Sequence, residues 1–205
     1  MNFLELGLYI ITVIVMIATP GPVMILVASA GLQGGYKAAL KTIFGTNFAS
    51  LVLIAISIFV LKGFLIIDER IFLAIKVIGS LYIAYIGYEI LKEVFQNDES
   101  GLQPLKPING GFKKGFFVGI SNPKDIIFFS SFFPQFINVH NSVNISLVIL
   151  VIAWIILDFL TLSIVYKTFN TVSKSQIYSK ILALCGLLLL AIAIYGLYTS
   201  IYTFI

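Results

Sequence analysis

Three charged residues lie inside long hydrophobic stretches of this sequence. Lys124 and Asp125 fall within the apolar segment 116–133, and Asp158 lies near the middle of the apolar segment 145–166. A charge at the centre of a membrane-spanning helix costs roughly 3 kcal/mol, so such a residue usually has a partner or a task. A lysine ammonium can bind a carboxylate, and an aspartate can bind an amino group or a proton. These residue types therefore indicate a binding site for a small charged solute at membrane depth.

A structural explanation competes with binding at each of these residues. Lys124 would then form a buried ion pair with Asp125 or Asp158, and neither acid would meet a ligand. Binding is favoured for Lys124 because it directly follows a helix break, where backbone N–H groups help to hold an anion. For Asp158 both explanations stay open, and Asp125 is a second candidate for binding a coupling ion or proton. Asn47 and Asn122 offer neutral hydrogen bonds near these charges.

Two proline-containing breaks interrupt the hydrophobic stretches about a hundred residues apart, at residues 19–22 and 121–125. Proline removes a backbone donor and clashes with the preceding turn, which costs roughly 3 kcal/mol inside a helix. A membrane protein tolerates such a break only where protein or a water-filled cavity satisfies the freed backbone groups. Paired breaks in the two halves of a membrane chain are a sequence signal for the binding site of a transporter.

The composition predicts an all-α integral membrane protein embedded in a lipid bilayer. The chain has 205 residues, of which 60% are hydrophobic and 11% are charged, and it leaves no room for a separate soluble domain. The net charge of +4 is read as an asymmetry between loops rather than as affinity for nucleic acid. One cysteine and one histidine argue against thiol–imidazole catalysis, a multi-histidine metal site and an intramembrane enzyme. We expect no cofactor.

Six hydrophobic spans are expected in a single transmembrane domain covering residues 1–205. They lie at residues 4–30, 38–61, 71–91, 112–133, 145–166 and 181–205, with the first interrupted at Pro20 and the fourth at Pro123. Residues 93–111 form a connecting loop between two halves of three spans each, residues 1–92 and 112–205. An odd number of spans per half gives the halves opposite orientations, so we predict two inverted three-helix repeats.

Basic residues are distributed unequally between the two sets of predicted loops. Nine fall in the connections that follow spans one, three and five, and two fall between spans two and three: Lys37, Lys41, Lys92, Lys106, Lys113, Lys114, Lys167, Lys174 and Lys180, against Lys62 and Arg70. Positive charge accumulates in cytoplasmic loops. The bias therefore places the 93–111 loop in the cytoplasm and both termini outside.

The two break motifs together resemble the LysE/RhtB family of amino-acid exporters. The resemblance rests on Thr-Pro-Gly-Pro at residues 19–22 and on Asn-Pro-Lys at residues 122–124, followed by Phe-Phe at 128–129 and Pro-Gln-Phe at 134–136. It extends over the whole chain and implies efflux of amino acids or small relatives, driven by an ion gradient, across the cytoplasmic membrane of a prokaryote. Asp125 departs from the family pattern, which has a small or apolar residue there.

Combining the motifs with the buried charges gives a set of expected site residues. The substrate site is predicted to contain Thr19, Pro20, Gly21, Pro22, Asn47, Asn122, Pro123, Lys124 and Asp158, and the coupling ion or proton is assigned to Asp158 and Asp125. Two other functions are kept as alternatives, an exporter of heavy-metal or other cations and an accessory membrane subunit. The identity of the amino acid, the coupling ion and the presence of a homo-oligomer are left open.

Overall fold

A computed structural model describes residues 1–19, 21–63, 69–96, 109–172 and 176–202. Within these ranges every secondary-structure element is a helix and there is no strand, in agreement with the predicted all-α class. The helices are α1 (Phe3–Ala18), α2 (Pro22–Leu61), α3 (Glu69–Gln96), α4 (Phe112–Ile120), α5 (Pro123–Ile127), η1 (Phe128–Phe132), η2 (Phe133–Val139), α6 (Val143–Val172) and α7 (Gln176–Tyr202). Most of the expected loop 93–111, and also Pro20, lies outside the described residues.

The first break separates α1 from α2. Thr19 and Gly21 both have extended backbone conformations, and α2 begins at Pro22. Proline is well suited to the first turn of a helix because its missing N–H has no intrahelical partner there. Further along, α2 loses helical geometry at Gly34 and Gly35, where Gly35 has a φ of +67°. The expected loop between the first two spans is therefore a short kink at Gly34 and Gly35 that joins two helical arms.

The second break separates α4 from α5. α4 ends at Ile120, and Asn122 has an extended backbone before α5 begins at Pro123. The chain then continues without a loop through a π-helical turn, η1, and a 3-10 segment, η2. This segment reaches Val139, six residues beyond the expected end of the fourth span at 133.

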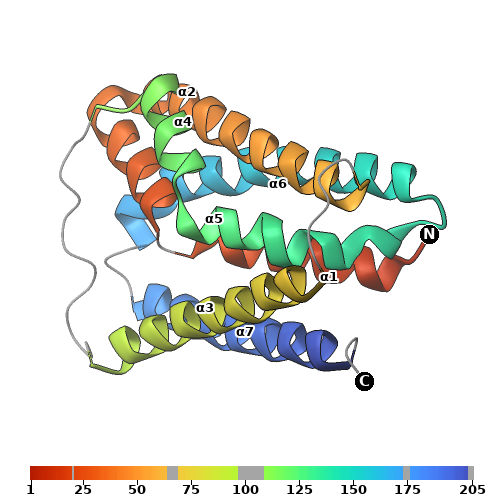
Figure 1. The fold of residues 1–205 in the computed structure, drawn as a ribbon. Helices are drawn as coiled ribbons and strands as arrows, with labels where there is room; N and C mark the ends of the chain where they lie inside the picture. The colour runs from red at the N-terminus through yellow and green to blue at the C-terminus, as the bar shows by residue number, and fades with distance from the viewer. Residues whose placement is uncertain (20, 64–68, 97–108, 173–175, 203–205) are drawn as a thin grey trace.

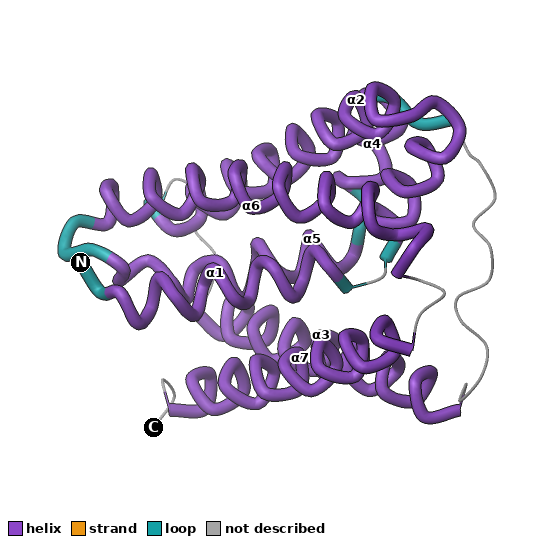
Figure 2. The backbone as a smooth tube through the Cα atoms, turned by 180° about the vertical axis from the view of Figure 1, so that it is seen from behind, coloured by secondary structure: helices purple, strands orange, loops and turns teal. Residues whose placement is uncertain are grey.

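The helices form a bundle in which α3 and α7 lie side by side along one edge (Figures 1 and 2). α1 and α5 occupy the middle of the bundle, while α2, α4 and α6 pack together on the other side. The start of α1 and the end of α7 lie at the same end of the bundle. Both breaks are buried in the bundle, since Thr19 and Asn122 are almost fully shielded from solvent.

Two of the described helices are long and apolar enough to cross a membrane, Pro22–Leu61 and Val143–Thr168. Two shorter apolar helices are Phe3–Ala18 and Ala183–Tyr198. Large apolar side chains also cover the outside of the molecule, including Phe44, Phe117 and Ile156, each at least half exposed. A hydrophobic exterior of this kind is suited to contact with lipid.

Glycines allow α4 to pack directly on α2. A Cβ at Gly45 would collide with the backbone carbonyl of Phe112, and a Cβ at Gly115 would collide with the carbonyl of Thr42. Small residues at a helix interface let the two backbones approach closely, which is a main source of helix association in lipid. The position of α4, and with it the start of α5, depends on this contact.

We predict that Gly45→Ala destabilises the protein by about 1–3 kcal/mol, because the added methyl group has to displace backbone rather than a flexible side chain. The measurement is the thermal unfolding midpoint of purified protein in detergent. Gly7→Ala is the matched control, since a Cβ there meets nothing within 4 Å and alanine favours the helix. Equal midpoints for the two variants would show that α2 and α4 do not need this close approach.

Candidate functional site

The side chain of Lys124 joins the second break to the first. Its Nζ donates hydrogen bonds to the backbone oxygens of Met16, at 2.6 Å, and Thr19, at 3.1 Å. These carbonyls belong to the end of α1, where the last turn lacks intrahelical donors and carries the negative end of the helix dipole. The buried ammonium therefore supplies the hydrogen bonds that the interrupted helix has lost.

The same ammonium lies beside the start of α2. A Cβ at Gly21 would lie 3.3 Å from Lys124 Nζ, so glycine leaves the room that the ammonium occupies. No side chain caps the N-terminus of α2. Lys124 thus sits between the negative end of α1 and the positive, uncapped start of α2. Its ammonium has three hydrogens, and two of them are directed to Met16 and Thr19.

Asn122 orients the residues that follow the second break. Its Oδ1 accepts a hydrogen bond from the backbone N–H of Lys124, at 3.3 Å, which caps the short helix α5 that starts at Pro123. The residue is 1% exposed. The Asn122 side chain also interacts with the carboxyl group of Asp125, so it helps to orient both residues that follow Pro123.

Asp158 is held by an amide from another helix. Asn47 of α2 donates from Nδ2 to Asp158 Oδ2 on α6, at 2.9 Å, and both side chains are buried. Asp125 is also buried and interacts electrostatically with Lys124 and with Asp158. Two carboxylates and one ammonium are thus gathered in the interior of the bundle.

Lys124 is not within ion-pair distance of either acid. By contrast, Lys92 and Glu89 form an ion pair on the surface, with 3.7 Å between Nζ and Oε1. In this structure the partners of Lys124 are backbone carbonyls, and the partner of Asp158 is an amide.

Lys124 and Asp158 lie at a similar depth along the bundle. α1 and α6 start at the same end (Figure 1), and Tyr9 Oη donates to the carbonyl of Leu150 at 3.0 Å. Seven further residues along each helix advance about 10 Å, at about 1.5 Å per residue. This step leads from Tyr9 to Met16, whose oxygen binds Lys124, and from Leu150 to Leu157, which precedes Asp158.

The structure adds an aromatic cluster that the sequence analysis did not include. Seven large rings are buried on the side of Lys124 toward the chain termini: Tyr9, Phe128, Phe129, Phe132, Phe133, Phe136 and Trp154. Trp154 packs against Phe128 and Phe129. The sequence did contain a signal for this cluster, because its single tryptophan lies four residues before Asp158.

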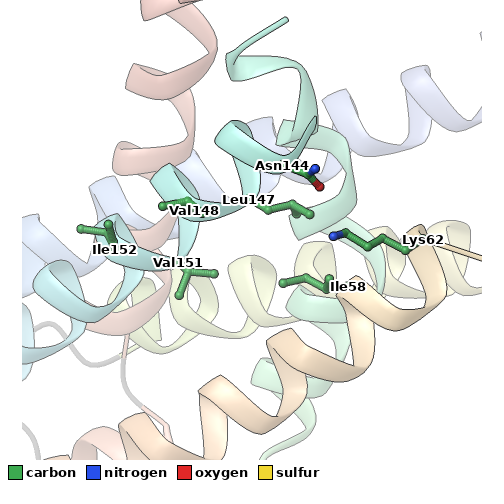
Figure 3. A pocket seen from close by; sticks show the side chains of 7 residues that line it. All are labelled: Ile58, Lys62, Asn144, Leu147, Val148, Val151 and Ile152. Atoms are coloured by element: carbon green, nitrogen blue, oxygen red, sulfur yellow. The ribbon is translucent and has the colours of Figure 1, made fainter. Parts of the chain in front are cut away.

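A separate groove of about 350 Å³ lies between the end of α2 and the start of α6 (Figure 3). Its lining is mainly apolar and consists of Ile58, Lys62, Asn144, Leu147, Val148, Val151 and Ile152. None of the expected site residues lines it. The buried charges and the groove are therefore different features.

Comparisons with known proteins agree with the family that the two break motifs indicate. The model of a family described as LysE type translocator matches residues 14–200. A leucine efflux protein of Salmonella typhimurium is 26% identical over 196 residues, which cover 90% of this chain and 91% of that protein. A leucine efflux protein of Klebsiella pneumoniae is 24% identical, with 92% of this chain and 90% of that protein covered.

A shorter match is to an uncharacterised membrane protein of Pseudomonas aeruginosa. It is 27% identical over 135 residues, which cover 63% of this chain and 62% of that protein, less than two thirds of its length. No solved structure matches the chain.

We predict that Lys124→Met is less stable than Lys124→Gln by about 2 kcal/mol. Both variants lose the charge, but the glutamine amide can still donate to the carbonyls of Met16 and Thr19, and an unsatisfied buried acceptor costs about 1–3 kcal/mol. The measurement is the thermal unfolding midpoint without added solute.

A second substitution tests the ion-pair alternative. Adding Asp158→Asn should not restore the stability of Lys124→Met, because Lys124 and Asp158 form no ion pair in the structure. Recovery of the parental midpoint in that double variant would show that the two residues neutralise each other.

Proposed function

We propose that this chain, which belongs to the LysE type translocator family, exports amino acids across the cytoplasmic membrane of a prokaryote. The observation that carries this proposal is the placement of Lys124, whose buried ammonium lies between the two helix breaks. The leucine efflux relatives support an amino acid as the solute and make leucine the first to test.

The proposed topology has six spans arranged as two inverted three-helix repeats. It is supported by the start of α1 and the end of α7, which lie at one end of the bundle, and by the interrupted segments, one in each half of the chain. In this arrangement α3 and α7 are the third spans of their halves, and they pack against each other. The excess of basic residues in alternate loops supports termini outside the cytoplasm.

The carboxylate of the amino acid is proposed to bind where Lys124 meets the start of α2. The uncapped N-terminus of α2 provides a positive dipole end and free backbone donors, and the ammonium provides a positive charge. The site would include Thr19, Gly21, Pro22, Asn122 and Pro123 around Lys124. Pro20 belongs to the same proposed site, although it lies outside the described residues.

The amino group is proposed to bind at Asp158, whose other contact is the amide of Asn47. A substrate ammonium would add a positive charge to a region that contains Asp158 and Asp125, two buried acids that repel each other. The same pair is the proposed site for a coupling proton, because protonation of one acid relieves this repulsion. Binding and proton release could then alternate as one part of the bundle rocks against the other.

The first prediction from this proposal concerns transport by the isolated protein. Proteoliposomes loaded with leucine and other amino acids should lose at least one of them faster than protein-free liposomes, and an imposed proton gradient should change the rate. Lys124→Gln should reduce this export strongly, because the amide keeps the donors but not the charge that attracts the carboxylate.

A correctly folded protein that exports none of the loaded amino acids would contradict the proposal. That result would favour an accessory subunit, which needs a partner for transport.

The second prediction concerns topology. A reporter that is active only outside the cytoplasm should be active when fused after Ile205, and a cytoplasmic reporter should be active in the connecting loop between the two halves. The physical reason is the nine-to-two distribution of basic residues between the two sets of loops. Cytoplasmic activity at the C-terminus would contradict both the orientation and the inverted repeat.

A further inference from the structure

Trp154 has a buried donor without an acceptor. Its side chain is 1% exposed, and its indole Nε1–H has no hydrogen-bond partner among the described residues. Buried tryptophan N–H groups usually find a partner, because leaving one unpaired loses the hydrogen bond that water would provide. This donor therefore requires an explanation.

The packing of the aromatic rings does not account for an N–H donor at this position. The indole lies 5.6 Å from the ring of Phe128, at 30°, and 4.6 Å from the ring of Phe129, at 67°. Both contacts are between aromatic rings, and a phenylalanine at position 154 could make contacts of the same kind. The donor is an additional polar feature of a site that is otherwise apolar.

The position of Trp154 connects it with the buried acid. The buried positions Leu150, Trp154 and Asp158 follow one another every four residues on α6, so they share one face of the helix. Residues four apart have Cβ atoms about 5–6 Å from each other. One face of α6 thus presents an unpaired donor and, one turn later, the carboxylate that Asn47 holds.

We propose that Trp154 Nε1–H donates a hydrogen bond to a carboxylate oxygen of the transported amino acid while Asp158 accepts from its ammonium. The inference rests on the proposed export of amino acids and adds a ligand to that site. An amino acid carries its acceptor and its donors on neighbouring atoms, which suits two protein groups one helical turn apart. Its carboxylate has two oxygens, so it can accept from Lys124 and Trp154 together.

The N–H of Trp154 would then select for solutes that carry a carboxylate. A solute without an acceptor at this position would leave the buried donor unpaired, and sites built around a hydrogen bond discriminate strongly against such analogues. Trp154 would be a specificity-determining residue, distinct from the aromatic rings that only pack around it.

The test removes the N–H and keeps the ring. Because the chain contains one tryptophan, biosynthetic incorporation of benzothienylalanine, in which sulfur replaces the N–H, alters this position alone. The probe is leucine, or the amino acid that the proteoliposome assay identifies, and its Kd is measured on purified protein. We expect Kd to rise about 10- to 100-fold, the range for a lost hydrogen bond to a charged group.

The unfolding midpoint without ligand separates recognition from structure. It should not fall in the benzothienylalanine protein, because no bond within the protein is lost, whereas the rise in midpoint that the amino acid causes should shrink. Phe129→Leu is the matched control, since it loosens the same packing, keeps the N–H and should lower the midpoint without ligand.

Two results would overturn the inference, and they are distinguishable from failure of the proposed function. Equal Kd values for the parent and the benzothienylalanine protein would show that the N–H does not contact the solute. A lower midpoint without ligand in the benzothienylalanine protein would show that the N–H serves the fold. If the parent protein binds no amino acid at all, the proposed function itself fails and the inference fails with it.

Discussion

The hydrogen bonds from the Lys124 ammonium to the carbonyls of Met16 and Thr19 hold the two interrupted segments together. An interrupted helix in a membrane leaves carbonyls that water cannot reach, and each one needs a donor from the protein. A lysine supplies several donors and a positive charge at the negative end of α1. These hydrogen bonds therefore offset both the cost of burying the ammonium and the cost of interrupting the helix.

The position of Lys124 depends in turn on small residues at a distance from it. Gly45 and Gly115 let the backbone of α4 lie against the backbone of α2, which fixes where α4 ends and where α5 begins. Gly21 leaves space for the ammonium itself. The charged interior is thus positioned by backbone contacts between helices rather than by ion pairs between side chains.

The sequence was sufficient for the helical class and for the family, and both were confirmed. Proline explains why helices begin at Pro22 and Pro123, since its missing N–H is harmless only in the first turn. The six spans, their inverted repeat and the site residues stay predictions. The contacts of Lys124 could not be read from the sequence, because they join residues more than a hundred positions apart. Composition identifies a buried lysine as costly but does not say which oxygens surround it.

The environment of Trp154 and the geometry of the kink in α2 could not be read from the sequence either. Hydrophobic patterning cannot distinguish a tryptophan that only packs from one whose N–H lacks an acceptor, because that depends on neighbours from other helices. The loop expected between the first two spans is reduced to a kink at Gly34 and Gly35, where two helical arms meet at non-helical backbone angles. Local sequence shows where the backbone can bend but not by how much.

The kink allows the first arm of α2 to rotate as a rigid segment about Gly34 and Gly35. The arm runs from residue 22 to residue 33 and is therefore about 18 Å long, at about 1.5 Å per residue. For an arm of this length, a rotation of about 10° at Gly34 and Gly35 would move the far end by about 3 Å. That displacement is comparable to the 3.3 Å between Nζ of Lys124 and the Cβ position of Gly21. A small change of backbone angle near one end of the bundle is thus enough to open or close the space beside the ammonium in its interior.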